Sequence, residues 1–270
     1  MTERDRRPAP ASPLQDLDRW IGGLDLTRWP AFMRPVIRGA GRLTELLGPY
    51  WAYLLPIVIG AAVFSTAVWA FGEVWEGVRE QGDLARLDEP VLQLAVALRA
   101  PVPDAVVTGF TFVGGPVVAP VLTVLAIAGL VIVRRSWTPV LVIVPAALGS
   151  LAMTIAGKRI FGRERPPMAD AVPPYETSAS FPSGHTLNAI VIAGAVGYVL
   201  LLKRRSVAGR VWTVAVAATY ALGIGLSRVY LGHHWLTDVV AAWVLGAAWL
   251  AVVVTVHRLF LTVHRSRAPG

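Results

Sequence analysis

Six long stretches of this chain contain no Asp, Glu, Lys or Arg. They cover residues 46–72, 105–133, 137–157, 177–202, 211–227 and 239–256. Because a transmembrane helix needs about 17 to 25 apolar residues, each stretch can supply one span. Gly114-Gly115-Pro116 interrupts the second stretch, so we expect its span to begin near Pro116. The pattern predicts an all-α polytopic membrane protein with six transmembrane helices.

The predicted spans divide the chain into a membrane domain and two tails. We place the spans at about 51–72, 116–133, 138–157, 186–202, 211–227 and 239–256, so that the membrane domain covers residues 51–256. Residues 1–50 are predicted to be a cytoplasmic tail. The spacing of Leu14, Leu17, Trp20, Ile21 and Leu24 fits a short helix on the membrane surface, and a loosely ordered tail is the alternative. Residues 257–270 are predicted to be a basic cytoplasmic tail.

The segment between the first two spans carries charges every few residues. A helical stripe within it is formed by Val91, Leu92, Leu94, Ala95 and Leu98. We therefore expect residues 73–104 to contain an amphipathic helix at the outer surface.

Composition and charge support this class of protein. The chain is 55% hydrophobic and 16% charged, with a mean hydropathy of +0.57. Its net charge of +8 does not indicate nucleic-acid binding, because most basic residues lie in the tails and in short turns such as 134–135 and 203–205. The positive-inside rule makes these turns and both termini cytoplasmic. The opposite side then receives residues 73–115, 158–185 and 228–238.

One outer segment violates the charge rule. Lys158, Arg159, Arg163 and Arg165 lie close together between two spans. Charges kept there against the topological preference need a chemical reason, and an anionic ligand supplies one. The chain between His185 and Arg228 is long enough for two membrane passes, so we expect the two outer loops to meet.

The second of these loops contains a histidine and a carboxylate four residues apart. His234 and Asp238 share one face if they begin the last span, so the carboxylate can hold Nδ1–H and leave Nε2 free to attack phosphorus. His233 lacks this spacing. A capping aspartate beside an interfacial histidine is the structural alternative.

The first loop ends in Pro-Ser-Gly-His at residues 182–185. Ser183 and Gly184 would present a hydroxyl and a backbone N–H to an anion at a helix N-terminus. His185 could protonate a leaving oxygen. Cations that could surround a phosphoryl group are Lys158, Arg165 and Arg228. Each feature alone also fits a helix cap or an interfacial anchor.

Together these segments resemble the three-part signature of the type 2 phosphatidic acid phosphatase (PAP2) superfamily. The matching residues are Lys158-x6-Arg165-Pro166, Pro182-Ser183-Gly184-His185 and Ser227-Arg228-x5-His234-x3-Asp238. The resemblance covers about residues 90–256 and implies a metal-independent lipid phosphatase with no cofactor. It implies that His234 forms a phosphohistidine, Asp238 orients it and His185 protonates the leaving group. The residues that would bind the phosphoryl oxygens are Lys158, Arg165, Ser183, Gly184 and Arg228.

The remaining residues of these loops receive weaker predictions. Arg159, Arg163 and Glu164 are expected to be solvated or supporting, and no role is assigned to them. Residues 167–181 are expected to form a lid that contacts the headgroup, with a rigid connector as the alternative. The chain has no HExxH, no paired-carboxylate cluster, no glycine-rich nucleotide loop and no cysteine, so histidine chemistry remains available and no metal site is predicted.

The predicted enzyme acts at the extracytoplasmic face of the plasma membrane, on a lipid phosphate or diphosphate held in the bilayer. Candidate substrates are phosphatidic acid, phosphatidylglycerol phosphate, diacylglycerol diphosphate and a polyprenyl diphosphate such as undecaprenyl diphosphate. One alternative is a phosphotransferase that passes the phosphoryl group to an acceptor alcohol. Another is a lipid-binding or transport protein, although binding alone does not need a leaving-group acid such as His185.

Overall fold

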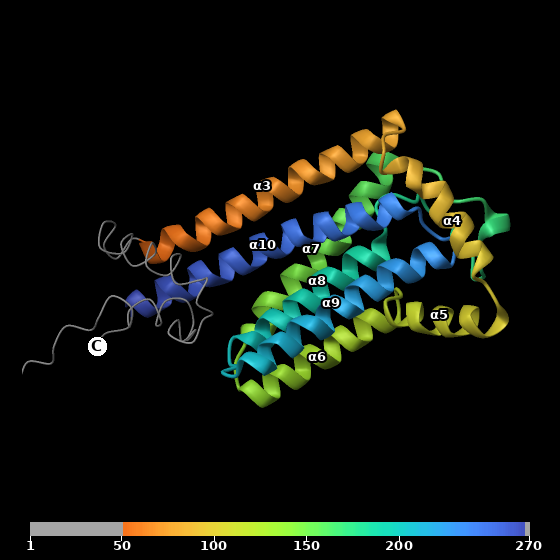
Figure 1. Cartoon of the computed structure of the whole chain (residues 1–270). Helices are drawn as coiled ribbons and strands as arrows, with labels where there is room; N and C mark the ends of the chain where they lie inside the picture. Colours follow the sequence, from red (N-terminus) through yellow and green to blue (C-terminus); the bar gives the residue numbers. More distant parts are fainter. Residues whose placement is uncertain (1–50, 268–270) are drawn as a thin grey trace, which may run out of the picture. The chain divides into compact units, whose positions relative to one another are not determined.

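Helices account for all regular secondary structure in residues 51–267, the range that the computed structural model describes (Figure 1). In chain order they are α3 (Trp51–Glu80), η4 (Ala85–Leu87), α4 (Asp88–Ala97), α5 (Pro101–Val113), α6 (Val118–Arg134), α7 (Thr138–Phe161), η5 (Met168–Asp170), α8 (Gly184–Leu201), α9 (Val207–Tyr230) and α10 (Leu236–Arg267). The predicted tail over residues 1–50, with its surface helix, lies outside this range.

Five of these helices are each long and apolar enough to cross a membrane: α3, α7, α8, α9 and α10. A sixth span is formed by α5 and α6 if this pair, bent by 49°, is counted as one. The bend falls at Gly114-Gly115-Pro116, where the sequence predicted an interruption. The prediction of an all-α polytopic membrane protein is confirmed.

Several helices extend beyond the predicted spans. α9 begins at Val207 and α10 at Leu236, although the spans were predicted to begin at residues 211 and 239. α10 also continues past residue 256 to Arg267. Polar residues at the ends of a span remain helical because each turn still satisfies its backbone hydrogen bonds. A charge-free stretch therefore marks the middle of a span better than its ends.

The predicted amphipathic segment contains α4. Of the apolar stripe, Leu92 and Ala95 are buried within the protein, whereas Leu94 and Leu98 are exposed. Asp88 is buried in the first turn of the same helix. The buried face of α4 therefore includes an aspartate, which hydrophobic spacing cannot reveal.

Residues 59–257 form one compact unit, and its core lies between α7, α8 and α10. Ile143, Leu187 and Ala242 are fully buried there. Gly149 allows close approach of α7 to α10, because a Cβ at this position would lie 2.2 Å from Cζ2 of Trp249. α8 packs against both α7 and α9. The first residues of α3 and the last turns of α10 belong to a second unit.

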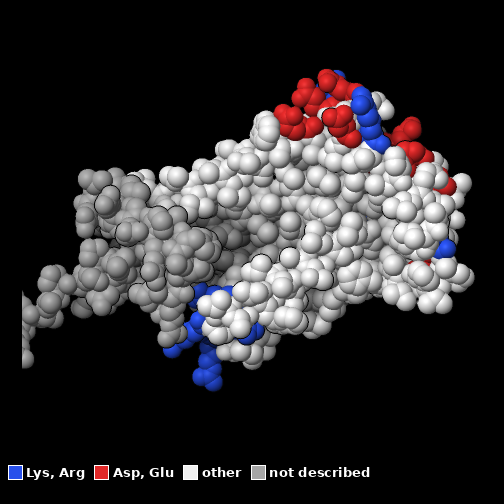
Figure 2. All heavy atoms as spheres, viewed as in Figure 1, with Lys and Arg blue, Asp and Glu red and all other residues white. Residues whose placement is uncertain are grey.

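Charged side chains gather in two separate places on this compact unit (Figure 2). Acidic residues cover the end of α3 and the segment that follows it, including Glu73, Glu76, Glu80 and Asp83. Basic residues cover the turns after α6 and α8, namely Arg134, Arg135, Lys203, Arg204 and Arg205. The end of α3 and the segment after it are therefore mainly acidic, whereas the turns after α6 and α8 are basic.

Candidate active site

Segments far apart in the sequence meet at the end of the bundle opposite the basic turns. They are the start of α4, the loop over residues 162–183, the start of α8 and the turn between α9 and α10. Gly232 in that turn has a φ of 67°. A Cβ there would lie 2.0 Å from the main-chain oxygen of Asp170, so a larger residue does not fit. The expectation that the two outer loops meet is confirmed.

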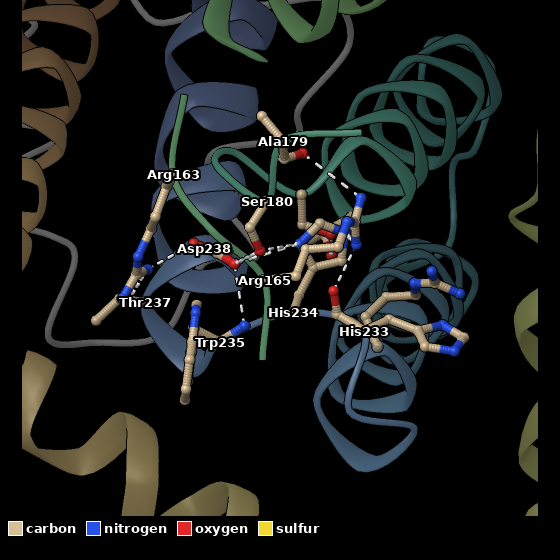
Figure 3. A network of polar contacts seen from close by, with 12 residues as sticks. Arg163, Arg165, Ala179, Ser180, His233, His234, Trp235, Thr237 and Asp238 are labelled. Atoms are coloured by element: carbon tan, nitrogen blue, oxygen red, sulfur yellow. Dashed lines mark hydrogen bonds and ion pairs between the residues drawn. The ribbon is translucent and has the colours of Figure 1, made fainter. Parts of the chain in front are cut away.

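His234 lies in the turn just before α10 and Asp238 in the first turn of α10, and both side chains are buried and face each other (Figure 3). Nδ1 of His234 lies 3.3 Å from Oδ2 of Asp238. The Ser180 hydroxyl donates a hydrogen bond to the same carboxylate oxygen and lies 3.3 Å from Nδ1. The Trp235 main-chain N–H also donates to Oδ2, at 3.0 Å. These contacts fix the carboxylate and leave Nε2 of His234 on the side away from it.

Arg163 supports this carboxylate from another side. Its Nη1 donates to Oδ1 of Asp238 at 2.6 Å and to Oγ1 of Thr237 at 2.7 Å. Its Nη2 donates to Oδ2 of Asp88 at 2.7 Å. The guanidinium also lies 5.7 Å from the centre of the Trp235 ring, where cation–π attraction is favourable. Of the two expectations for Arg163, solvated or supporting, the structure favours the supporting one.

Asp88 connects the start of α4 to the start of α10. Its Oδ1 accepts the Thr237 N–H at 2.9 Å, and its Oδ2 accepts the Thr237 hydroxyl at 2.6 Å. A carboxylate is favourable there because helix N-termini carry unpaired N–H groups and partial positive charge. We call Asp88, Arg163, Thr237 and Asp238 the Arg163 cluster. Every carboxylate oxygen of its two aspartates accepts at least one hydrogen bond.

Lys158 and Arg165 approach the same site through the loop. Nζ of Lys158 donates to the Ser178 hydroxyl at 3.0 Å and to the main-chain oxygen of Ala179. Arg165 donates to the main-chain oxygen of Ser178 at 2.6 Å. Its Nη1 lies 3.3 Å from Nε2 of His234. A guanidinium is thus placed beside the nitrogen that was predicted to attack phosphorus.

Arg228 and Arg165 share a carboxylate that the sequence analysis did not single out. Nη2 of Arg228 donates to Oε1 of Glu176, while Nη2 of Arg165 donates to Oε2 at 2.7 Å. Nδ1 of His185 lies 3.8 Å from Oε1. Arg228 also lies 3.3 Å from the Thr111 hydroxyl in α5. We call Arg165, Glu176, His185 and Arg228 the Glu176 cluster.

A cavity of about 440 Å³ opens beside the Glu176 cluster. The predicted site residues that line it are Lys158, Gly184, His185, Arg228 and His234. Another wall comes from the α5–α6 break, with Gly114, Gly115 and Pro116. Ser183 is fully buried, and its hydroxyl accepts a hydrogen bond from Thr186 at 2.9 Å. The structure therefore brings the predicted residues together, while the Ser183 hydroxyl is turned toward its own helix.

Electrostatics favour the neutral form of both histidines in the α9–α10 turn. Burial lowers the pKa of His234 well below its ordinary value, and Arg165 and Arg228 lower it further. Burial and Arg228 likewise lower the pKa of His233 to about 4. Nε2 of His233 lies 2.6 Å from the main-chain oxygen of Val172. A neutral His234 can keep a lone pair on Nε2, as a nucleophile requires.

Asp88, Glu176 and Ser180 reach the site without any local sequence signal. Asp88 and Thr237 are 149 positions apart, and Glu176 and Arg228 are 52 positions apart. For Arg163, a sequence signal did exist, because it belongs to the outer loop whose excess of charge indicated a functional site. No group of three or more His, Cys, Asp or Glu side chains that could hold a metal occurs within the described part of the chain.

Comparison with known proteins gives a family match and several relatives. A family model described as the PAP2 superfamily matches residues 118–261. A Bacillus subtilis protein named Phosphatidylglycerophosphatase B is 30% identical over 199 residues, which cover 73% of this chain and 89% of that protein. A Sulfolobus acidocaldarius protein named Undecaprenyl-diphosphatase is 38% identical over 78 residues, which cover 29% of this chain and 33% of that protein.

A solved structure shares the fold. It is the crystal structure of a transmembrane PAP2 type phosphatidylglycerolphosphate phosphatase from Bacillus subtilis, with a TM-score of 0.66 and 26% identity. The likeness covers 72% of this chain and 95% of that one. The family match alone covers more than half of the chain and includes all of the predicted site residues. The chain therefore belongs to the PAP2 superfamily and is a multi-pass membrane phosphatase.

Proposed function

We propose that the chain hydrolyses a phosphate monoester or diphosphate of a membrane lipid through a phosphohistidine at His234. The observation that carries the proposal is the orientation of this ring. Nδ1 lies 3.3 Å from Asp238, and Nε2 lies 3.3 Å from Arg165. His234 lines the same cavity as Lys158 and Arg228. Asp238 would stabilise the positive charge that develops on the imidazole as Nε2 attacks.

In the first step, Nε2 of His234 bonds to phosphorus and the bond from phosphorus to the lipid oxygen breaks. His185, which lines the same cavity, would give its proton to the departing oxygen. Lys158, Arg165 and Arg228 would neutralise the phosphoryl oxygens. The backbone N–H of Gly184, at the start of α8, would add a further donor.

In the second step, water attacks the phosphorus of the phosphohistidine. His185, now neutral, takes a proton from the water, and the N–P bond breaks to release inorganic phosphate and restore His234. An acceptor alcohol in place of water would make the same site a phosphotransferase. Analysis of the phosphorylated product therefore separates the two reactions.

Phosphatidylglycerol phosphate is the substrate that we place first. The relative whose match covers 89% of its length is named Phosphatidylglycerophosphatase B. The match to the undecaprenyl-diphosphatase covers 33% of that protein, so its support is narrower. An apolar cavity of about 440 Å³ along α6, α8 and α9 could hold an acyl chain. Asn188 lines both this cavity and the one at the site.

Phosphate release from lipids by the purified protein in detergent, with EDTA present, tests the proposed chemistry. The panel contains phosphatidylglycerol phosphate, phosphatidic acid and undecaprenyl diphosphate, and His234→Ala is the matched variant. We expect release by the wild type and a loss of about 10³-fold or more in the variant. Equal rates for both proteins would exclude His234 as the nucleophile, and labelled phosphate on an acceptor lipid would indicate transfer.

We also propose that the site faces the extracytoplasmic side of the plasma membrane, with both termini in the cytoplasm. The separation of acidic and basic segments in Figure 2 supports this, because cytoplasmic turns favour Lys and Arg. The chain has no cysteine, so single cysteines can be introduced at Asp83 and at Arg204, both exposed. A membrane-impermeant maleimide should label the first in intact cells and the second after lysis. The reverse pattern would invert the topology.

A further inference from the structure

Glu176 places a carboxylate where the proposed phosphoryl group would bind. Its Oε2 accepts a hydrogen bond from Arg165 at 2.7 Å, and its Oε1 accepts one from Arg228. Oε1 also lies 3.8 Å from Nδ1 of His185. A carboxylate and a phosphoryl group use the same arginine N–H groups. Both cannot occupy these donors at once.

The charge on Glu176 suits this position. Burial raises the pKa of its carboxyl, but the opposing effect of nearby positive charge, above all that of Arg228 and also that of Arg165, is larger and holds the pKa at about 2. Glu176 is therefore ionised at neutral pH. Arg228 is 2% exposed, and a guanidinium removed from water needs a nearby anion. Glu176 supplies that counter-charge when no substrate is bound.

The fit between Glu176 and the arginines is incomplete. Nε of Arg228 is buried and has no hydrogen-bond partner among residues 51–267. A carboxylate has two oxygens in one plane, whereas a phosphoryl group has three arranged around phosphorus. The third oxygen can reach a donor that Glu176 leaves unused, and a phosphomonoester carries more negative charge. A phosphoryl group can therefore bind these donors more strongly than Glu176 does.

Glu176 lies on a stretch of loop that can move while its anchors remain. The Val172 N–H donates to the main-chain oxygen of Leu231 at 2.9 Å, and the Ser180 N–H donates to that of Arg163 at 2.8 Å. Between these anchors, Tyr175 and its neighbours are exposed, and Glu176 alone points its carboxylate to the arginines while remaining 27% exposed. Rotation of this side chain toward water would release its hydrogen bonds to Nη2 of Arg165 and Nη2 of Arg228 without breaking either anchor, while Arg165 would stay held by the main-chain oxygen of Ser178.

We propose that Glu176 is an internal competitor for the phosphate subsite. Its carboxylate occupies Arg165 and Arg228 in the empty enzyme, yields them to the phosphoryl group of the substrate, and returns as inorganic phosphate leaves. This inference rests on the proposed function. It makes Glu176 a determinant of specificity, because a ligand with a single carboxylate cannot offer the third oxygen. It also weakens product inhibition by phosphate.

Kinetics of Glu176→Gln in detergent test this competition. Removing the negative charge should lower both KM and the inhibition constant for inorganic phosphate by about 10-fold, because binding no longer displaces a charge-assisted pair. The matched control is Glu164→Gln, which makes the same charge change at an exposed position of the same loop. It should leave both constants within about 2-fold. A rise in KM together with a fall in kcat would overturn the proposal and make Glu176 a positioning residue for the arginines.

Thermal unfolding with inorganic phosphate tests the same contact without turnover. We expect phosphate to raise the Tm of Glu176→Gln at about 10-fold lower concentration than it does for the wild type or Glu164→Gln. Equal midpoints in all three proteins would refute the competition. Because this readout does not depend on catalysis, an inactive wild type would reject the proposed function while leaving the Glu176 result interpretable.

A second variant keeps the test valid if Glu176→Gln does not fold. Glu176→Asp retains the charge but is too short by one methylene to hold both arginines as Glu176 does. It should shift the phosphate midpoint in the same direction by a smaller factor, about 3-fold. An unchanged or weaker response to phosphate in Glu176→Asp would refute the proposal.

Discussion

The Arg163 cluster and the Glu176 cluster both pair arginines with carboxylates, yet their carboxylates come from different kinds of structure. Asp88 and Asp238 lie in the first turns of two helices, and their side chains are 6% and 0% exposed. Glu176 lies in a loop and is 27% exposed. An ion pair between helix ends can open only if a helix moves. When the carboxylate comes from a loop side chain, a ligand anion can replace it at the arginine with a much smaller loss of free energy.

The difference assigns separate tasks to the two clusters. A buried ion pair adds little stability compared with apolar packing, but removing one partner is costly because the other charge stays buried. The Arg163 cluster therefore fixes the start of α10 and, through Asp238, the orientation of His234. The Glu176 cluster keeps Arg165 and Arg228 available to a ligand.

Loss of Arg228 should affect activity far more than stability. In the proposed mechanism, Arg228→Gln would remove a cation that neutralises phosphoryl charge, while Glu176 can turn toward water. We therefore expect kcat/KM to fall by about 10³-fold, or about 4 kcal/mol. Phosphate release and Tm are measured on the same preparation. Arg159→Gln, at an exposed position of α7, should change neither. Parallel losses of activity and Tm in Arg228→Gln would contradict the separation of tasks.

Loss of Asp88 should lower the stability of the protein. Asp88→Ala leaves Arg163 short of one anion and the Thr237 N–H without its acceptor, and we expect the free energy of unfolding to fall by about 3 kcal/mol. The measurement is denaturant or thermal unfolding in detergent. Asp83→Ala is the control, since that side chain is fully exposed, and it should not change the midpoint. Equal midpoints for both variants would show that the Arg163 cluster does not hold α10.

Arg163→Lys tests whether one cation must bridge two carboxylates. Lysine keeps the charge but cannot reproduce two fixed N–H directions, so it can satisfy Asp88 or Asp238 and not both. We expect a loss of about 2 kcal/mol in stability and about 10-fold in kcat, with KM unchanged. A change confined to KM would instead indicate that Arg163 contacts the substrate.

The pH dependence of stability should report on the loop that carries Glu176. The pKa of His233 is about 4 in the folded protein and ordinarily 6.5, so the folded state holds fewer protons between these values. The stability from His233 is therefore complete above pH 6.5 and is lost as pH falls toward 4. Between pH 7 and pH 5, the wild type should therefore lose about 2 kcal/mol more free energy of unfolding than His233→Gln, which has no imidazole to titrate. An unchanged slope would show that His233 does not titrate in this way.

The architecture was largely predictable because the physical requirement is local. A bilayer span must be apolar over its own length, so six charge-free stretches identified the spans, and Gly114-Gly115-Pro116 identified the break. The face of α4 was not predictable in the same way. Asp88 is buried because Thr237 and Arg163 bind it, and both lie far along the chain.

The same difference between local and long-range contacts explains which site residues could be predicted from the sequence. His234 and Asp238 are four residues apart, so their pairing could be predicted from helical spacing. Glu176 and Ser180 act through contacts with residues more than 50 positions away, at Arg228 and Asp238, and no local spacing encodes these. Polar side chains in a loop could be predicted to lie near the site, but not which of them would turn inward.

The bend between α5 and α6 has a consequence for the depth at which polar chemistry can occur. A break in a span leaves backbone N–H and C=O groups without helical partners, and hydrocarbon cannot satisfy them. The break lines the cavity beside His185 and Arg228, where water or a headgroup can reach those groups. The interruption therefore provides a polar opening in a surface of the bundle that is otherwise apolar. It marks the level at which a lipid headgroup could meet the side chains of the proposed active site while the lipid tails stay in the bilayer.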